Sequence, residues 1–127
     1  MTPLPNAWTL DPATLAEAVA LRHELHRCPE VSGAEYETAK RIAARMHALG
    51  AEVATGLGGT GVAAVFGPKD LQGGTTLMIR AELDALPILE AEGPEHRSEV
   101  DGVGHLCGHD GHMAILFAVA TALSRHT

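Results

Sequence analysis

The run Gly111–Ser124 constrains the fold most, because it contains no Asp, Glu, Lys or Arg. Its composition and length predict a helix, ending before Arg125, that is apolar nearly all round. Such a helix must be buried on most of its sides. Its longest apolar stretch, Met113–Leu123, is too short to span a membrane, so we do not interpret it as a transmembrane segment.

A helix is also predicted near the N-terminus. Asp11 followed by Pro12 is a favoured pair of N-cap and first helical residue. Pro29 disfavours helical geometry at the residue before it, so this helix should end near Arg27. The residues expected on its apolar stripe are Leu15, Ala18, Val19, Leu21 and Leu25.

The next helix is bounded by a start signal and a stop signal. Ser32–Glu35 reads as a capping box, with Ser32 as the N-cap residue. Gly50 is the expected residue just beyond the C-terminal cap. The predicted buried face consists of Ala39, Ile42, Ala43, Met46 and Leu49.

After Gly50 the hydrophobic period changes to that of strands. Ala51–Thr55, Gly61–Phe66 and Thr75–Arg80 are predicted strands, separated by glycine-rich turns. The third is continuously apolar, as expected of a central strand covered on both faces. Residues 81–104 form a long acidic connection, and connections of that length in compact domains tend to be functional. These elements together predict an α/β fold.

Composition excludes several classes of function. The 127-residue chain has nine basic and sixteen acidic residues, a net charge of −7 that disfavours binding to nucleic acid or an anionic membrane. The N-terminus lacks the basic and apolar regions of a signal peptide. The two cysteines, Cys28 and Cys107, are typical of reduced thiols. We therefore expect a cytoplasmic protein with one core.

The most reactive stretch is residues 105–112, which combines three histidines, one cysteine and one aspartate. Imidazole and thiolate are ready ligands of zinc-like divalent ions. In an extended segment His105, Cys107 and His109 would project to the same side. A metal site is the favoured interpretation. The alternative is a polar loop that caps the final helix through Asp110.

Several segments together resemble the hippurate hydrolase-like amidohydrolases, the N-acyl-amino-acid hydrolase branch of the aminoacylase and carboxypeptidase metallopeptidase superfamily. The resemblance runs from about residue 15 to the end. It is carried by Leu21–Glu30, Glu35–Thr38, Leu49–Gly50, Gly59–Val62, Ile79–Ile88, Glu90 and Gly104–Met113. It implies that residues 11–127 are the N-terminal portion of a zinc-exopeptidase-like (phosphorylase/hydrolase-like) catalytic domain, with helices packed on a mixed sheet. Residues 1–10 would be a flexible lead-in.

The resemblance also implies roles for individual residues. Cys107 and His109 would be metal ligands, and Asp84 would orient a ligand from behind. The other residues with expected supporting roles are Arg80, Glu82, His105, Asp110 and His112. Glu82 departs from the family, which usually has aspartate there. An ion pair between Arg80 and Asp84 is the structural alternative.

The implied reaction is hydrolysis of the amide bond of a small N-acyl amino acid. Two divalent ions (Zn, Mn, Co or Ni) would activate a water molecule, and a glutamate from a Glu-Glu pair would serve as general base. This sequence contains no Glu-Glu pair. We therefore expect the chain to carry the first half of the site, with the rest of the catalytic domain and the lid or dimerisation domain absent. It should show little turnover alone.

Two other classes of function remain open. The chain could be a non-catalytic metal-binding or interaction module, with a homodimer formed through the apolar final helix. It could also be an inactive fragment that exposes the same helix as a sticky patch.

Overall fold

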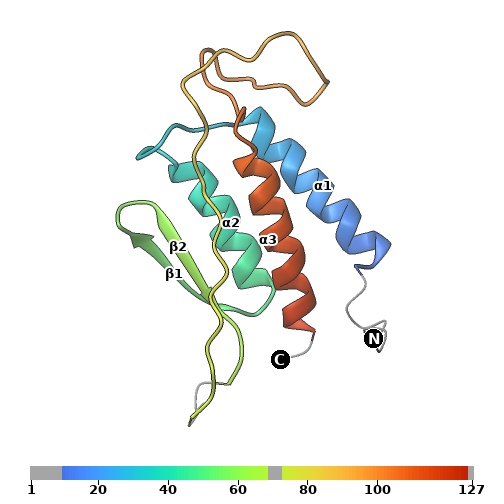
Figure 1. The fold of residues 1–127 in the computed structure, drawn as a ribbon, viewed down its shortest axis with the longest axis vertical. Coiled ribbons are helices and arrows are strands. Elements are labelled where there is room, and N and C mark those ends of the chain that lie inside the picture. Colours follow the sequence, from blue (N-terminus) through green and yellow to red (C-terminus); the bar gives the residue numbers. More distant parts are fainter. Residues whose placement is uncertain (1–9, 69–72, 126–127) are drawn as a thin grey trace.

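The computed structural model describes residues 10–68 and 73–125. Its elements follow in the order α1 (Pro12–Arg27), α2 (Tyr36–Ala48), β1 (Glu52–Leu57), β2 (Gly61–Val65) and α3 (His109–Ser124). The three helices lie side by side, and the two strands pack against α2 (Figure 1). The predicted α/β class is thus confirmed. Within the described ranges, no helix is both long and apolar enough to cross a bilayer. Of the predicted lead-in, residues 1–9 lie outside the described part.

Helix α1 begins and ends as predicted. The Asp11 carboxylate accepts a hydrogen bond from the backbone N–H of Thr14 at 2.8 Å, and Pro12 is the first helical residue. Its buried residues are Thr14, Ala18, Leu21, Leu25 and His26. The prediction was wrong for Leu15 and Val19, which are 53% and 44% exposed. Each follows a buried residue by one position, about 100° further round the helix, and so faces solvent.

Helix α2 begins at Tyr36, and the predicted capping box does not form. The carboxylate of Glu35 is used elsewhere, since it accepts hydrogen bonds from a backbone N–H at 2.9 Å and from the Thr60 hydroxyl at 2.7 Å. The Glu30 carboxylate caps the helix instead, accepting from the backbone N–H and the hydroxyl of Thr38. A negative charge at this end also suits the helix dipole.

The end of α2 follows the predicted glycine motif. Gly50 has a φ of 89°, a left-handed conformation that glycine adopts without strain. Its N–H donates to the carbonyl of His47 at 3.0 Å, and the N–H of Ala51 donates to the carbonyl of Met46 at 3.2 Å. These two bonds form a Schellman motif, which turns the chain from α2 into β1.

Strands β1 and β2 form an antiparallel hairpin. The register pairs Thr55 with Val62 and contains an irregularity between Thr55 and Leu57. A Cβ at Gly61 would lie 2.5 Å from the carbonyl oxygen of Leu57, so this turn requires glycine. Two of the three predicted strands are therefore present.

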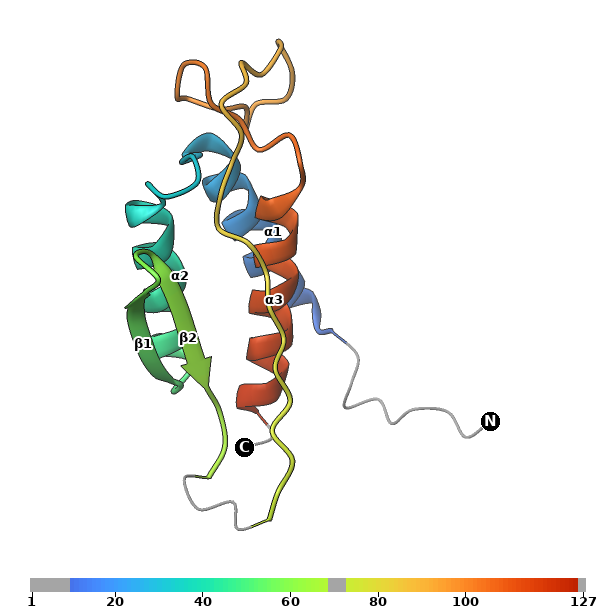
Figure 2. The same cartoon turned by 60° about the vertical axis from the view of Figure 1, so that its left-hand side comes forward.

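The third predicted strand, Thr75–Arg80, does not form in the described part of the chain. The segment runs extended along the helix layer (Figure 2). Its Leu77 and Met78 are more than 80% exposed. A strand needs a neighbouring chain to take its backbone hydrogen bonds, and the described sheet consists of β1 and β2 only. The predicted mixed sheet is thus represented there by one hairpin and by isolated bridges, of which Val31 with Ala85 is parallel.

The core lies between the helices and the hairpin. Its buried apolar residues are Ala18, Leu21, Leu25, Ile42, Met46, Ala51, Met113, Phe117 and Ala120. Helix α3 begins at His109, two residues earlier than predicted, and buries Met113 and Phe117 against α1 and α2. Ile115 on the same helix is 64% exposed. The described residues therefore cover only part of this apolar helix.

We expect Met113→Ala to lower the free energy of unfolding by about 2–5 kcal/mol, because it opens a cavity in a close-packed core. Ile115→Ala is the matched control on the same helix and should change stability by less than about 0.5 kcal/mol. Urea unfolding followed by circular dichroism measures both. Equal effects of the two substitutions would contradict this description of the core.

Candidate metal site

The part of the connection from residue 85 to residue 104 folds over one end of the helix layer (Figure 1). It is anchored where the N–H of Ala85 donates to the carbonyl of Glu30 at 2.8 Å, and where Leu86 and Gly104 exchange two backbone hydrogen bonds at 3.0 Å. These bonds bring the segment around Asp84 to the start of α3. Residues far apart in the sequence therefore meet at the N-terminus of that helix.

His109, the first residue of α3, is held by Asp84. Its Nδ1 lies 3.0 Å from the Asp84 carboxylate and 2.9 Å from the Asp84 carbonyl oxygen. Both partners are acceptors, so Nδ1 carries the proton and Nε2 keeps its lone pair. Nε2 has no hydrogen-bond partner among the described residues. A carboxylate behind an imidazole is the usual arrangement for a metal-ligating histidine.

Cys107 lies immediately before this helix and is exposed, with a free thiol. Gly108 separates it from His109 and has a φ of 89°, which a side chain would strain. The chain therefore turns sharply between the thiol and the imidazole. The backbone of this segment is not the regular extended one that the sequence predicted, because the helix has already begun at His109.

His112 and Glu82 form a second pair, with Nδ1 and Oε2 3.1 Å apart. The hydrogen bond from His112 is the main cause that lowers the pKa of the Glu82 carboxyl. The Glu82 carboxylate thus has a hydrogen-bond partner. Arg80 lies 3.7 Å from Glu82 rather than pairing with Asp84, so the predicted alternative ion pair is not the one formed.

His105 points away from this exposed surface. It is 4% exposed, and its Nε2 is buried without a hydrogen-bond partner among the described residues. Burial lowers the pKa of its imidazole and favours the neutral form. Since Cys107 is exposed and His105 is buried, the two do not project to the same side as an extended segment would require.

Asp110 is fully buried and is not the N-cap of α3, which is Gly108. Its Oδ2 accepts a hydrogen bond from Nδ1 of His26 at 2.7 Å and forms an ion pair with Nε of Arg22 at 2.9 Å. Nε2 of His26 in turn lies 2.6 Å from the carboxylate of Glu90. Asp110 therefore belongs to a buried charge network that joins α1, α3 and the connection.

No site role was predicted for Arg22, His26 or Glu90. The first two are four residues apart and hence neighbours on one face of α1. The sequence offered one signal for a role of this pair: both side chains are ionisable and lie toward the core side of an amphipathic helix. Their acidic partners lie 64 and 84 residues from His26, and no local pattern identifies them.

The pKa values of both acidic partners are lowered. Burial opposes ionisation of Glu90, but hydrogen bonds from the backbone N–H of Ser98 and from His26 outweigh it and lower the pKa of the carboxyl. Burial likewise opposes ionisation of Asp110, and its hydrogen bond with His26, together with nearby positive charge, lowers its pKa. Both groups are therefore carboxylates at neutral pH.

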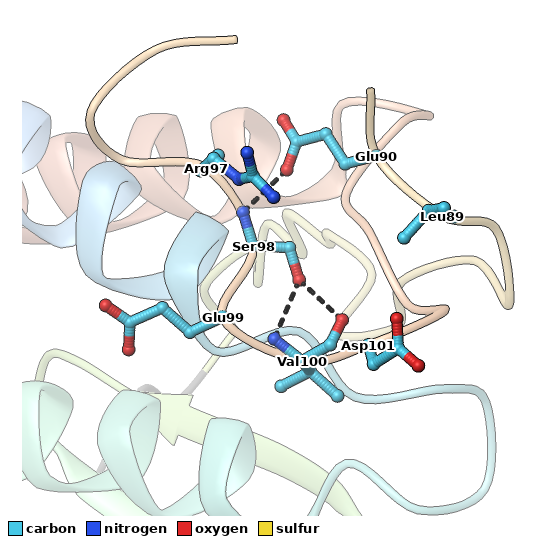
Figure 3. A pocket seen from close by; sticks show the side chains of 7 residues that line it. All are labelled: Leu89, Glu90, Arg97, Ser98, Glu99, Val100 and Asp101. Carbon is cyan, nitrogen blue, oxygen red and sulfur yellow. Dashed lines mark hydrogen bonds between the residues drawn. The ribbon is translucent and has the colours of Figure 1, made fainter. Parts of the chain in front are cut away.

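Two shallow hollows lie beside these groups. One of about 290 Å³ is formed within the connection, and Glu90 and Ser98 lie on its wall (Figure 3). The other, of about 310 Å³, lies between the segment 79–82 and α3 and includes Glu82 and His112. The second is the one that adjoins the histidines of the candidate site.

The donor set fits a divalent ion in part. A thiol and an imidazole with a free Nε2 are suitable ligands. However, residues 10–68 and 73–125 contain no group of three or more His, Cys, Asp or Glu side chains placed to hold a metal ion. The described residues therefore offer two candidate ligands, Cys107 and His109, and a closed site needs more.

Comparisons with known proteins agree with the motifs. Residues 78–127 match the model of peptidase family M20/M25/M40. Thermostable carboxypeptidase 2 of Saccharolobus solfataricus is 39% identical over 85% of this chain, and hippurate hydrolase of Campylobacter jejuni is 38% identical over 82%. The chain spans 27% of the length of each of these two relatives.

A solved structure shows the same fold. It is that of the YXEP protein of Bacillus subtilis, described as a dinuclear metal-binding peptidase of family M20, and it superposes with a TM-score of 0.82 at 36% identity. The match covers 91% of this chain and 32% of that one. The resemblance predicted from the motifs is confirmed. This chain is related to peptidase family M20/M25/M40 and corresponds to the N-terminal part of its members.

Because folding lowers the pKa of Glu90 and Asp110, the unfolded state binds more protons than the folded one in acid. The stability from these carboxylates is fully present above about pH 4.5, the ordinary value for glutamate, and is lost as the pH falls through the lowered pKa values. We expect the free energy of unfolding to decrease as the pH is lowered from 5 to 3. Glu90→Gln should show a smaller decrease. An identical pH dependence of the variant and the wild type would show that Glu90 contributes nothing.

Proposed function

We propose that this chain contributes one part of the metal centre of a metal-dependent amidohydrolase that acts on N-acyl amino acids. The contact between His109 and the carboxylate of Asp84, two residues beyond the exposed thiol of Cys107, carries the proposal. The family relationship supports it, since a related structure is described as a dinuclear metal-binding peptidase.

In this proposal Cys107 and His109 are metal ligands through Sγ and Nε2. Asp84 keeps the proton of His109 on Nδ1, so the lone pair of Nε2 remains available. Supporting roles are proposed for Arg80, Glu82, His105, Asp110 and His112. The ion would be zinc, manganese, cobalt or nickel, and a thiolate ligand favours the softer of these.

Bound divalent ions would supply an activated water and polarise the amide carbonyl of the substrate. Glu82 and His112 line the hollow beside the proposed ligands, where they can hold a polar group of the substrate by hydrogen bonds. The general base is expected to be a glutamate of a Glu-Glu pair, which this sequence does not contain. This chain is therefore proposed to bind metal without completing the reaction alone.

The proposed substrates are small N-acyl amino acids such as hippurate-like conjugates. Hippurate hydrolase and a carboxypeptidase are both among the relatives, and both names denote cleavage of a C–N bond next to an amino acid. The net charge of −7 disfavours a polyanionic substrate. A cytoplasmic location agrees with the two free cysteines.

A second candidate function is a non-catalytic metal-binding or interaction module. It is favoured by the exposed apolar residues Leu77, Met78 and Ile115, which would suit a protein contact and allow a homodimer. Metal binding without hydrolysis, together with a defined dimer in sedimentation, would support this alternative.

We expect Co²⁺ added to the purified chain to produce a thiolate-to-metal charge-transfer band, because the Cys107 thiol is exposed beside His109. Cys107→Ser should remove the band and weaken binding more than about tenfold, since even indirect partners of a ligand cost that much. Cys28→Ser is the control and should retain the band. A band that survives Cys107→Ser but is lost in Cys28→Ser would show that Cys28, and not Cys107, is the thiolate ligand.

We expect little or no release of free amino acid from N-acetyl and N-benzoyl amino acids by the chain alone, with manganese or zinc added. The reason is the missing general base. Metal-dependent release that is lost in Cys107→Ser would show that the chain is a complete enzyme and would contradict the partial-site proposal.

A further inference from the structure

Resting on the function proposed above, we propose that His26 is a positioning residue for the metal centre. It joins the two segments that carry the proposed ligand His109 and its orienting residue Asp84. It does so by binding Asp110 and Glu90 at the same time. His26 touches neither metal nor substrate in this proposal and acts through these two carboxylates.

The geometry requires His26 to donate from both ring nitrogens. Nδ1 lies 2.7 Å from Oδ2 of Asp110, and Nε2 lies 2.6 Å from Oε1 of Glu90. Both partners are carboxylates and can only accept, so the ring carries two N–H groups and is an imidazolium. Arg22 approaches Nδ1 only to 3.5 Å and directs its Nε at Asp110 instead. Two charge-assisted hydrogen bonds thus diverge from one ring.

Each carboxylate belongs to one side of the candidate site. Asp110 follows His109 directly in the first turn of α3. Glu90 lies in the connection that continues from Asp84. Its carboxylate has a second partner besides His26. Its second oxygen accepts from the backbone N–H of Ser98 at 2.6 Å (Figure 3). The imidazolium therefore ties the start of α3 to the segment that follows Asp84.

Because these side chains are buried, loss of one charged partner is costly. The side chains of His26 and Asp110 are 5% and 1% exposed, and that of Glu90 is 12% exposed. Removing the imidazolium leaves two carboxylates with Arg22, on the Asp110 side, to offset part of their charge and with little water to screen them, which is costly. They are expected to move apart. The contact between His109 and Asp84 lies one residue along the chain from Asp110, so it loses its fixed geometry.

The decisive variants are His26→Gln and Glu90→Gln, and His47→Gln is the control on the exposed face of α2. A glutamine at 26 cannot donate in two opposite directions. A glutamine at 90 can accept only one of the two hydrogen bonds that the carboxylate accepts. We expect 10- to 100-fold weaker Co²⁺ binding for His26→Gln, about tenfold weaker binding for Glu90→Gln, and no change for His47→Gln.

A second readout needs no metal. The ¹⁵N spectrum of the histidine rings reports the tautomer of His109, which Asp84 fixes with the proton on Nδ1 in the wild type. We expect a mixture of tautomers in both decisive variants and the wild-type spectrum for His47→Gln. A residue that merely stabilised the core would lower the midpoint of unfolding without changing the tautomer of His109 in the folded chain.

The outcomes separate this inference from the proposed function. If the wild type binds no Co²⁺, the proposed metal site is wrong, while the tautomer of His109 still tests the positioning by His26. If His26→Gln does not fold, Glu90→Gln decides, because it leaves the pairing of His26 with Asp110 in place. Wild-type metal affinity and a single tautomer of His109 in a folded decisive variant would overturn the inference.

Discussion

The packing of α3 against α1 is the constraint on which the rest of the structure depends. Leu21 and Leu25 of α1 meet Met113 and Phe117 of α3 in the core, and this contact sets the start of α3 beside the end of α1. Asp110 is consequently buried next to Arg22 and His26. A carboxylate in that position needs cationic partners. The apolar packing and the buried charges therefore specify the same arrangement.

The candidate site uses this frame without being part of the core. His109 extends from the first turn of a packed helix, and Asp84 reaches it from the long connection. Functional side chains are commonly carried by loops that a rigid scaffold positions. Here the connection is held by the Leu86 and Gly104 backbone pair and by the contact of Glu90 with His26. The contact between His109 and Asp84 is therefore framed by groups that lie outside the segment 105–112.

Exposed apolar surface and only two candidate metal ligands occur together in the described part of the chain. In the solved M20 structure, the part that matches this fold makes up 32% of the chain. The exposed residues Leu77 and Met78 lie in the segment predicted as a central strand, and Ile115 lies on the helix predicted to be buried all round. Each departure from prediction is thus a surface that lacks a neighbour among the described residues.

Local chemistry determined much of this protein in advance. Pro12 and Gly50 delimit helices because one presets φ and the other relieves strain. Metal binding by the motif around Cys107 and His109 follows from residue types alone and stays a prediction. The tertiary structure decided the pairings, such as Glu30 capping α2 and His26 bridging Glu90 and Asp110. These partners are separated along the chain. No local periodicity encodes such contacts, because they arise only after helix packing brings the segments together.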